Sequence, residues 1–356
     1  DTVDAGAEFA LVSYDNIDPI VYGPSSGGSC CDTACDAAPC HSDDWMSSMK
    51  SRLGTCRVYG AIDALYWHRT NGNKSVPLIV DANSGSQIVS TSDFEFSYES
   101  GYRATVGVGH VGMCCLPAVE MTFLGIYDWS DSVGARGDNS LSLAGDLGSV
   151  VNGFTLAEGI GARYKSELNS FETNYFGCIL ESCCCDCYRR MDWLVGFRYL
   201  SLDERLGIIG LNEDVAAAAY RVDADNDLYG MQIGSRYRGT KGCLGIEVLG
   251  KLGLYGNDAS QRQSIVDELG TNNVVLRHAN SSGGQTAYSA EFGISGIAKL
   301  TGCCGIRAGY NLLWLGGLAL APDQLDFSDT PTSGVALSRG GNVFMHGFNV
   351  GIECGW

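Results

Sequence analysis

The sequence FMHGFNVGIECGW, residues 344–356, decides the fold class of this chain. Every second residue belongs to a set that is mostly apolar or aromatic: Phe344, His346, Phe348, Val350, Ile352, Cys354 and Trp356. The residues between them are mostly small or polar: Met345, Gly347, Asn349, Gly351, Glu353 and Gly355. Because successive side chains of a strand point to opposite faces, the stretch predicts a β-strand with one apolar face and one polar face.

The same two-faced alternation recurs along the chain. Including the last strand, it predicts ten strands, and the other nine lie near 57–68, 99–110, 119–129, 158–175, 190–203, 227–238, 243–255, 288–295 and 306–314. Most are about 9–11 residues or longer, the length that a tilted strand needs to cross a bilayer. A soluble β-sandwich also alternates in this way, so the pattern alone leaves a soluble protein open.

The connections between these strands fall into two kinds. One kind is short and carries cysteine, at 111–118, 177–189, 239–242 and 301–304. The other kind is long and lacks cysteine, at 69–98, 130–157, 204–226, 256–287 and 317–342. Short periplasmic turns and longer outer loops are typical of outer-membrane barrels. This sorting favours a barrel and predicts that every cysteine lies at one rim.

The composition agrees with a barrel. The chain has 48 glycines and 7 prolines, its charged residues make up only 18%, and no apolar run approaches the roughly 18 residues that a membrane helix needs. A closed barrel is the remaining way for such a chain to span a bilayer. We therefore expect an all-β protein, a transmembrane antiparallel up-and-down β-barrel of about ten strands, with twelve as the alternative count.

The N-terminal part differs from the rest. Residues 1–55 are acidic, contain four cysteines and show little periodicity, so we expect a Cys-rich segment at the periplasmic side, followed by the barrel over 56–356. The chain opens without a basic and then apolar leader, which is what a cleaved export signal would leave, although a cytosolic protein would look the same. The net charge of −18 argues against nucleic acid as a partner.

Sixteen cysteines indicate an oxidising compartment and disulfide bonds. The disulfide candidates are Cys30, Cys31, Cys35, Cys40, Cys56, Cys114, Cys115, Cys178, Cys183, Cys184, Cys185, Cys187, Cys243, Cys303, Cys304 and Cys354. A metal or iron–sulfur site is the weaker reading, because no CxxC pair is matched by a second one at zinc-ribbon distance. We expect no metal and no cofactor.

Four stretches carry a family resemblance: WLVGFRYLSLDE at 193–204, YGMQIG at 229–234, GYNLLWLGGLALAPDQ at 309–324 and HGFNVGI at 346–352. They resemble a family of outer-membrane β-barrel proteins abundant in planctomycetes, which is similar to a pore-forming outer-membrane group described in Legionella. The resemblance covers roughly 57–356 and does not extend to the cysteine-rich features. It implies a transmembrane barrel in the outer membrane of a Gram-negative-type envelope and no catalytic residue.

The polar faces of the strands carry charges of both signs. We expect the lumen to be lined by Arg103, Glu120, Arg198, Arg236, Glu247, Glu291, Arg307 and Glu353. With these, Arg57, Arg163, Lys165, Arg238, Lys251 and Lys299, and Asp63, Asp128 and Asp192, give ten inward cations against seven carboxylates. The charges could pair across a narrow lumen, or they could form an ion-selective lining. Barrels of about eight strands are filled by side chains, which disfavours a wide porin.

Chemistry of other kinds has little support in the sequence. The run 223–227 alternates aspartates as in a calcium loop, but it lacks the glycine and the distal glutamate, so a solvated loop is expected there. His278 is placed in an outer loop near Asp267 and Glu268, where an outer-rim hydrolase could keep a catalytic pair. Without a second motif we interpret it as a surface histidine and expect no enzyme.

The leading interpretation is an integral outer-membrane barrel with a structural or anchoring role in the cell envelope and at most a narrow pore. The alternative is a porin-like channel for small solutes or ions. We expect outer-membrane lipid as a partner, and homo-oligomers or covalent multimers through the cysteines, or envelope and surface-layer proteins, as further partners.

Overall fold

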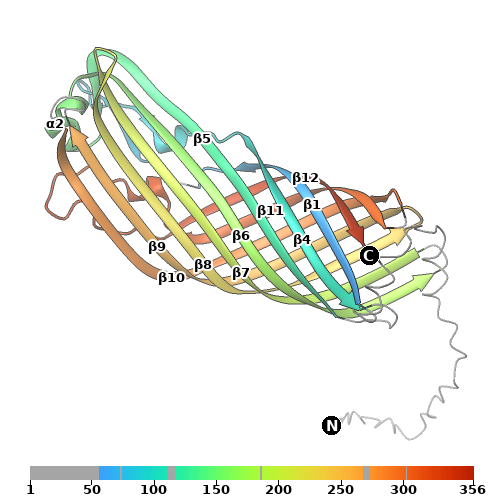
Figure 1. The fold of residues 1–356 in the computed structure, drawn as a ribbon. Helices are drawn as coiled ribbons and strands as arrows, with labels where there is room; N and C mark the ends of the chain where they lie inside the picture. The colour runs from blue at the N-terminus through green and yellow to red at the C-terminus, as the bar shows by residue number, and fades with distance from the viewer. Residues whose placement is uncertain (1–55, 73, 111–116, 185–186, 268–272, 302) are drawn as a thin grey trace, which may run out of the picture.

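A computed structural model describes residues 56–72, 74–110, 117–184, 187–267, 273–301 and 303–356. Ten long antiparallel strands form a closed ring, in which each strand pairs with its neighbours and β5 pairs with β6 to close it (Figure 1). The ring strands are β1 (Cys56–Arg69), β4 (Tyr98–His110), β5 (Ala118–Leu143), β6 (Ala157–Cys184), β7 (Cys187–Asn212), β8 (Val215–Lys241), β9 (Leu244–Asp267), β10 (Val274–Lys299), β11 (Cys304–Leu318) and β12 (Gly341–Gly355). The all-β barrel of ten strands is confirmed.

The remaining elements are small and lie between ring strands. They are β2 (Pro77–Asp81), β3 (Gln87–Ser90), η1 (Thr91–Asp93), α2 (Leu147–Val150), η2 (Asn152–Phe154) and η3 (Ala321–Gln324). The β2–β3 hairpin pairs with the far end of β5 and lengthens the sheet there. No helix in the described part of the chain is long or apolar enough to cross a membrane.

Several strands are much longer than predicted. β6 has 28 residues and β8 has 27, so the stretches 130–157, 204–226 and 256–287, expected as long loops, are largely strand. β7 and β8 are joined by only Glu213 and Asp214, both with positive φ (50° and 57°). A two-residue hairpin turn of type I′ requires this conformation at both positions.

The two ends of the barrel differ in their connections (Figure 1). The C-terminus lies at the end where β8 passes to β9 through residues 242 and 243. The opposite end carries the three long segments 70–97, 144–156 and 319–340, called the outer segments below. Short turns mark the periplasmic end of an outer-membrane barrel, so the outer segments face outward from the cell.

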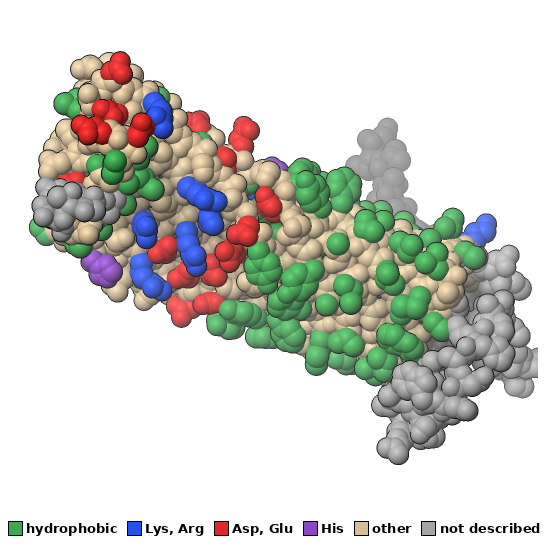
Figure 2. All heavy atoms as spheres, turned by 45° about the horizontal axis from the view of Figure 1, so that its top comes forward, with side chains coloured by type: hydrophobic (Ala, Val, Ile, Leu, Met, Phe, Trp, Pro, Cys, Tyr) green, Lys and Arg blue, Asp and Glu red, His purple; other side chains and the backbone are tan. Residues whose placement is uncertain are grey.

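An apolar belt surrounds the periplasmic half of the barrel (Figure 2). Ile62 and Ile352, which face each other across β1 and β12, are 69% and 57% exposed. Other exposed members of the belt are Tyr102, Val106, Met121, Phe171, Tyr175, Trp193, Phe197, Tyr229, Met231, Ile233, Leu252, Leu254, Tyr288, Phe292, Ile306, Phe348 and Val350. A continuous exposed apolar surface of this kind needs lipid to cover it.

Beyond the belt, the polarity of the strand faces is inverted. In β6, Tyr164 and Leu168 point inward and are buried, whereas Arg163 and Lys165 point outward. Nearer the periplasm the same strand turns Phe171 outward and Glu172 inward. The prediction that Arg163 and Lys165 face the lumen was therefore wrong, because charged residues mark the inner face only where lipid covers the outer one.

Candidate functional site in the barrel lumen

The outer half of the lumen is filled by a hydrophobic core, called the outer core below. The outer segments contribute fully or nearly fully buried side chains to it, namely Leu78, Phe94, Phe96, Leu147, Val151, Phe154, Leu320 and Ala321. The strands contribute inward side chains, namely Leu65, Trp67, Trp129, Ile160, Tyr164, Leu200, Leu206, Tyr220, Tyr255, Leu313 and Met345. The barrel is therefore packed like a protein interior over this half.

Polar side chains of the barrel wall hold the segment 319–340 in place. Asn226 on β8 donates to the Ala319 carbonyl oxygen at 2.8 Å and accepts from the Ala319 N–H at 2.7 Å. On β9, Gln261 donates to the Gly334 carbonyl oxygen and Gln263 to that of Gln324, each at 2.6 Å. These amide groups are buried and supply the partners that a buried backbone requires.

The segment 144–156 is anchored in the same way. Asp267 on β9 accepts hydrogen bonds at 2.9 Å from the N–H groups of both Asn152 and Gly153. The backbone of Gly153 also packs directly on β7, where a Cβ at Gly210 would overlap the Gly153 carbonyl oxygen. Glycine at 210 therefore permits the close approach of this segment to the wall.

Two carboxylates of the segment 319–340 have shifted pKa values. Burial raises the pKa of Asp323, although Lys74 opposes the shift. Burial alone would raise the pKa of Asp326, but hydrogen bonds from Ser328 and from the Gly334 N–H outweigh it and lower the pKa. The stabilising contribution of Asp326 is therefore present near neutral pH and is lost as the pH falls through its lowered pKa.

A fully buried ion pair lies within the outer core. Arg69 on β1 contacts Glu204 on β7, and both side chains are 0% exposed. Glu204 also accepts from the Tyr164 hydroxyl at 2.7 Å and from the Ala321 N–H at 2.8 Å, so it links the wall to the segment 319–340. The Arg69 guanidinium lies 4.7 Å from the ring centre of Phe96, a cation–π contact with the segment 70–97.

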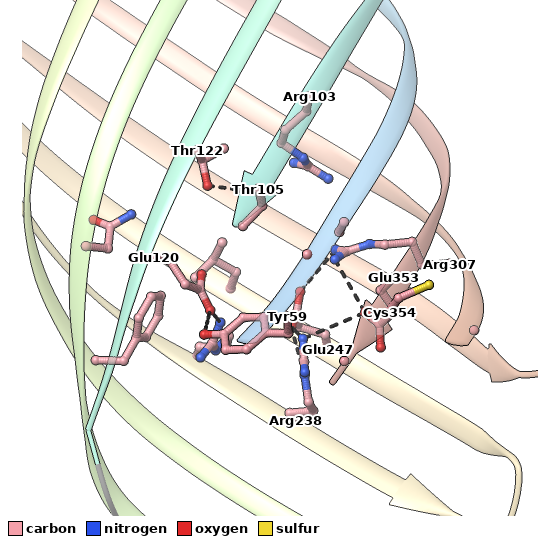
Figure 3. Close-up of a pocket in the computed structure, with 18 of the residues that line it drawn as sticks. Tyr59, Arg103, Thr105, Glu120, Thr122, Arg238, Glu247, Arg307, Glu353 and Cys354 are labelled. Carbon is pink, nitrogen blue, oxygen red and sulfur yellow. Dashed lines mark hydrogen bonds and ion pairs between the residues drawn. The ribbon is translucent and has the colours of Figure 1, made fainter. Parts of the chain in front are cut away.

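The periplasmic half of the lumen is hollow and is called the inner vestibule below. It contains a cavity of about 320 Å³ that reaches the rim at Cys303, Cys304 and Cys354. Its lining includes seven cations and five carboxylates: Arg103, Arg198, Arg236, Arg238, Lys251, Lys299, Arg307, Glu120, Glu172, Glu247, Glu291 and Glu353. Figure 3 shows such side chains entering the vestibule from several strands.

One group of ion pairs in the vestibule is centred on Arg307. Its guanidinium lies 3.1 Å from a Glu247 oxygen, 3.3 Å from an Asp63 oxygen and 3.6 Å from a Glu353 oxygen. Glu247 also binds Arg238, and Asp63 binds Arg103 at 2.8 Å. Two carboxylates are thus each shared by two arginines, which links β1, β4, β8, β9 and β11 across the lumen (Figure 3).

A second group lies against β5. Glu120 is bound by Arg236 and accepts a hydrogen bond at 2.6 Å from the Tyr59 hydroxyl. The Arg236 guanidinium stacks 3.8 Å from the ring centre of Phe176 and lies 3.6 Å from an Asp192 oxygen. The arginine is thereby held flat against the wall.

A third group lies deepest in the vestibule. Lys251 lies 2.9 Å from Glu172 and 3.0 Å from Glu291, and Arg198 lies 2.6 Å from Glu291 and 4.0 Å from Glu172. Two cations and two carboxylates therefore form a closed quartet beneath the outer core. Each charge has two opposite neighbours, which limits the cost of desolvating it.

All eight residues predicted to line the lumen lie on the inner face and take part in these ion pairs. The sequence missed Glu172 and Arg190, whose inward positions follow from the alternation of β6 and β7. It also misplaced Asp128, which is exposed because a bulge between Ile126 and Trp129 shifts the register. The predicted excess of lumenal cations was wrong, since seven cations pair with seven carboxylates.

The described cysteines lie at the periplasmic end of the strands. Cys304 and Cys354 face each other on β11 and β12 and form a disulfide with a Cα–Cα distance of 4.1 Å. Cys178 and Cys187 are also disulfide-bonded, whereas Cys243 is an exposed thiol. The segment 1–55 with Cys30, Cys31, Cys35 and Cys40 lies outside the described residues, as do Cys114, Cys115, Cys185 and the side chains of Cys56, Cys183 and Cys184.

Residues 59–356 match the family described as "Putative beta barrel porin-7 (BBP7)". The chain belongs to this family. The protein is accordingly an outer-membrane β-barrel of porin-like type, in agreement with its strand ring and belt. No curated protein matches it.

Solved structures with a similar fold are also outer-membrane proteins. The protease OmpT of Escherichia coli is 8% identical, with a TM-score of 0.44 over 85% of this chain and 97% of that one. A major outer membrane protein of Thermus thermophilus is 8% identical, with a TM-score of 0.33 over 84% and 99%. A FadL homologue of Pseudomonas aeruginosa is 7% identical, with a TM-score of 0.24 over 85% and 90%. At these identities the likeness concerns the fold.

Proposed function

We propose that this member of the porin-7 family is a channel for small ions or solutes that rests closed, with the inner vestibule facing the periplasm and the outer core as the closure. The observation that carries the proposal is the contrast between the two halves of the lumen. The inner half holds a cavity of about 320 Å³ lined by charged side chains, whereas apolar side chains fill the outer half. Paired charges give little net stability compared with apolar packing, so a barrel that served only as an anchor would gain more from an apolar filling throughout.

A structural or anchoring barrel is the second candidate. It is favoured by the outer core, because buried side chains and the amide bonds of Asn226 and Gln261 hold the outer segments in the mouth. In that case the vestibule would be a dead end. The two candidates differ in whether ions cross the outer half.

Replacing Lys299 by glutamate is expected to shift the ion preference of the channel toward cations. Lys299 lines the vestibule near the rim and makes no ion pair with a described residue, so its substitution changes the lumenal charge without breaking a pair. The measurement is the reversal potential of the reconstituted protein in a planar bilayer under a salt gradient. Lys241→Glu is the matched control, because Lys241 lies at the same end on the outward face of β8.

The control should leave the reversal potential unchanged. An equal shift in both variants would show that the vestibule does not set selectivity. A complete absence of discrete conductance steps at any voltage, in the native protein and in Lys299→Glu alike, would leave the structural candidate in its place.

A further inference from the structure

The outer wall of β6 to β9, beyond the belt, carries charges sorted into rows. The strand register places cations farthest from the belt and carboxylates nearer to it. The basic rows contain Arg163, Lys165, Arg205, Arg221 and Arg262, with Asp223 among them. The acidic rows contain Glu167, Asp203, Asp225, Asp227 and Asp258. Figure 2 shows neighbouring bands of basic and acidic side chains between the belt and the outer end.

The sorting places like charges directly opposite one another. Lys165 faces Arg205 across β6 and β7, and Asp203 faces both Glu167 and Asp225. Opposed side chains on one face of a sheet lie about 4.5–5.5 Å apart, and like charges there are destabilising. The arrangement therefore costs stability in the isolated protein and calls for counter-charges from outside it.

The basic rows have little compensation from the protein itself. Arg262 lies 3.7 Å from Asp225, but Arg163, Lys165, Arg205 and Arg221 make no ion pair with any residue that the structure describes. All four are exposed or half-buried on the outward face. Unpaired arginine forks presented together are suited to phosphate or carboxylate groups.

The height of the basic rows above the membrane limits the partner. Phe171, Tyr199 and Tyr229 lie side by side in the register and mark the outer edge of the belt. Lys165 is six residues beyond Phe171 in β6, and Arg205 is six beyond Tyr199 in β7. At about 3.3 Å per residue and a tilt of about 40°, this places them about 15 Å above the aromatic edge. The polar region of a bilayer leaflet is only about 5–8 Å deep, so a phospholipid phosphate does not reach them.

A second copy of the chain does not satisfy these rows. Copies in one membrane share an axis along the membrane normal, so a symmetric pair places each row opposite the same row of its partner. Acidic rows would then face acidic rows. The partner must instead present anionic groups well above the lipid surface while occupying the belt below.

We propose that the basic rows bind the anionic sugar headgroup of an outer-leaflet glycolipid whose acyl chains cover the belt of β6 to β9. Phosphate or carboxylate groups on its sugars reach Lys165 and Arg205, which the first phosphate above the acyl chains does not. The acidic rows lie between, at the level where divalent cations held by such a glycolipid neutralise carboxylates.

The test is a titration of fluorescent deep-rough lipopolysaccharide, which carries phosphorylated inner sugars, into the purified full chain in uncharged detergent with magnesium. The double variant Lys165→Gln with Arg205→Gln is expected to bind it about tenfold to thirtyfold more weakly than the native protein, since each basic residue contributes about a factor of five. Phosphatidylglycerol should bind weakly and equally to both proteins.

The matched control is Arg189→Gln with Lys241→Gln. It removes one arginine and one lysine from the outward face on the other side of the belt, and its affinity for the glycolipid should equal that of the native protein. Equal glycolipid affinity in the native protein and the Lys165/Arg205 variant would overturn the proposal. So would an equal loss for phosphatidylglycerol, which would place the anion at the membrane surface. A protein partner that is lost from native membranes while glycolipid affinity persists would replace the glycolipid as the ligand of this face.

Discussion

Replacing Arg69 by alanine is expected to lower the free energy of unfolding by about 3–5 kcal/mol, because it leaves the carboxylate of Glu204 buried without its cation. Both side chains are 0% exposed, and no water-filled space lies beside them to take over the role of the guanidinium. The cation–π contact with Phe96 is lost as well. The measurement is urea unfolding of the barrel in lipid vesicles, followed by tryptophan fluorescence.

A double variant separates the loss of charge balance from the loss of packing. Arg69→Met with Glu204→Gln removes both charges and keeps an oxygen that accepts from Tyr164 and from the Ala321 N–H. Replacing a buried ion pair by groups of similar volume is often close to neutral, so most of the stability should return. If Arg69→Ala alone is as stable as the native protein, the outer half is not the dry core described above.

Replacing Val350 by arginine is expected to cost about 2–4 kcal/mol, the range for a cation on the lipid face near the bilayer midplane. Val350 is 57% exposed on the outward face of β12 and lies midway between His346 and Cys354 along that strand. The measurement is the equilibrium stability in lipid vesicles.

Ser282→Arg on β10 provides the matched control for Val350→Arg. Ser282 is exposed on the outward face beyond the belt and pairs with Ser260 in the register, so an arginine there meets water and the acidic rows. Its cost should be near zero. A cost near zero for Val350→Arg as well would contradict the lipid-facing orientation of the belt.

The periplasmic half of the fold could be predicted from the sequence because two solvents oppose each other there. Lipid outside and a charged lumen inside force strict alternation, as in 344–356, and the ten predicted strands all appear in the ring. The short cysteine-bearing connections were predicted for the same reason, since they separate clearly alternating stretches.

The outer half could not be predicted with the same rule, because water lies outside and the apolar core inside. The aspartates of 223–227 were interpreted as a solvated loop, yet they lie on the outward face of β8, with Ala224 and Asn226 buried between them. The alternation itself continued through this run and was the signal available. Its polarity was reversed, so it did not resemble a membrane strand.

The lumen could be predicted in its composition but not in its closure. Arg307 and Glu247 were assigned to the inner face from alternation alone, and they lie 3.1 Å apart. That the segment 319–340 folds into the mouth depends on contacts with Asn226 and Gln261, more than 70 residues away in the chain. No local pattern encodes such contacts.

Single-channel recording in planar bilayers tests the closure of the lumen most directly. Leu318 and Gly341 pair across β11 and β12, so a short Gly-Asn turn can replace residues 319–340 without spanning a gap. The native protein is predicted to show rare and small conductance steps, and the shortened variant is predicted to show larger steps that persist, because part of the outer core is gone. Equal conductance in the two proteins, or large steady openings of the native protein, would contradict a lumen closed by its outer half.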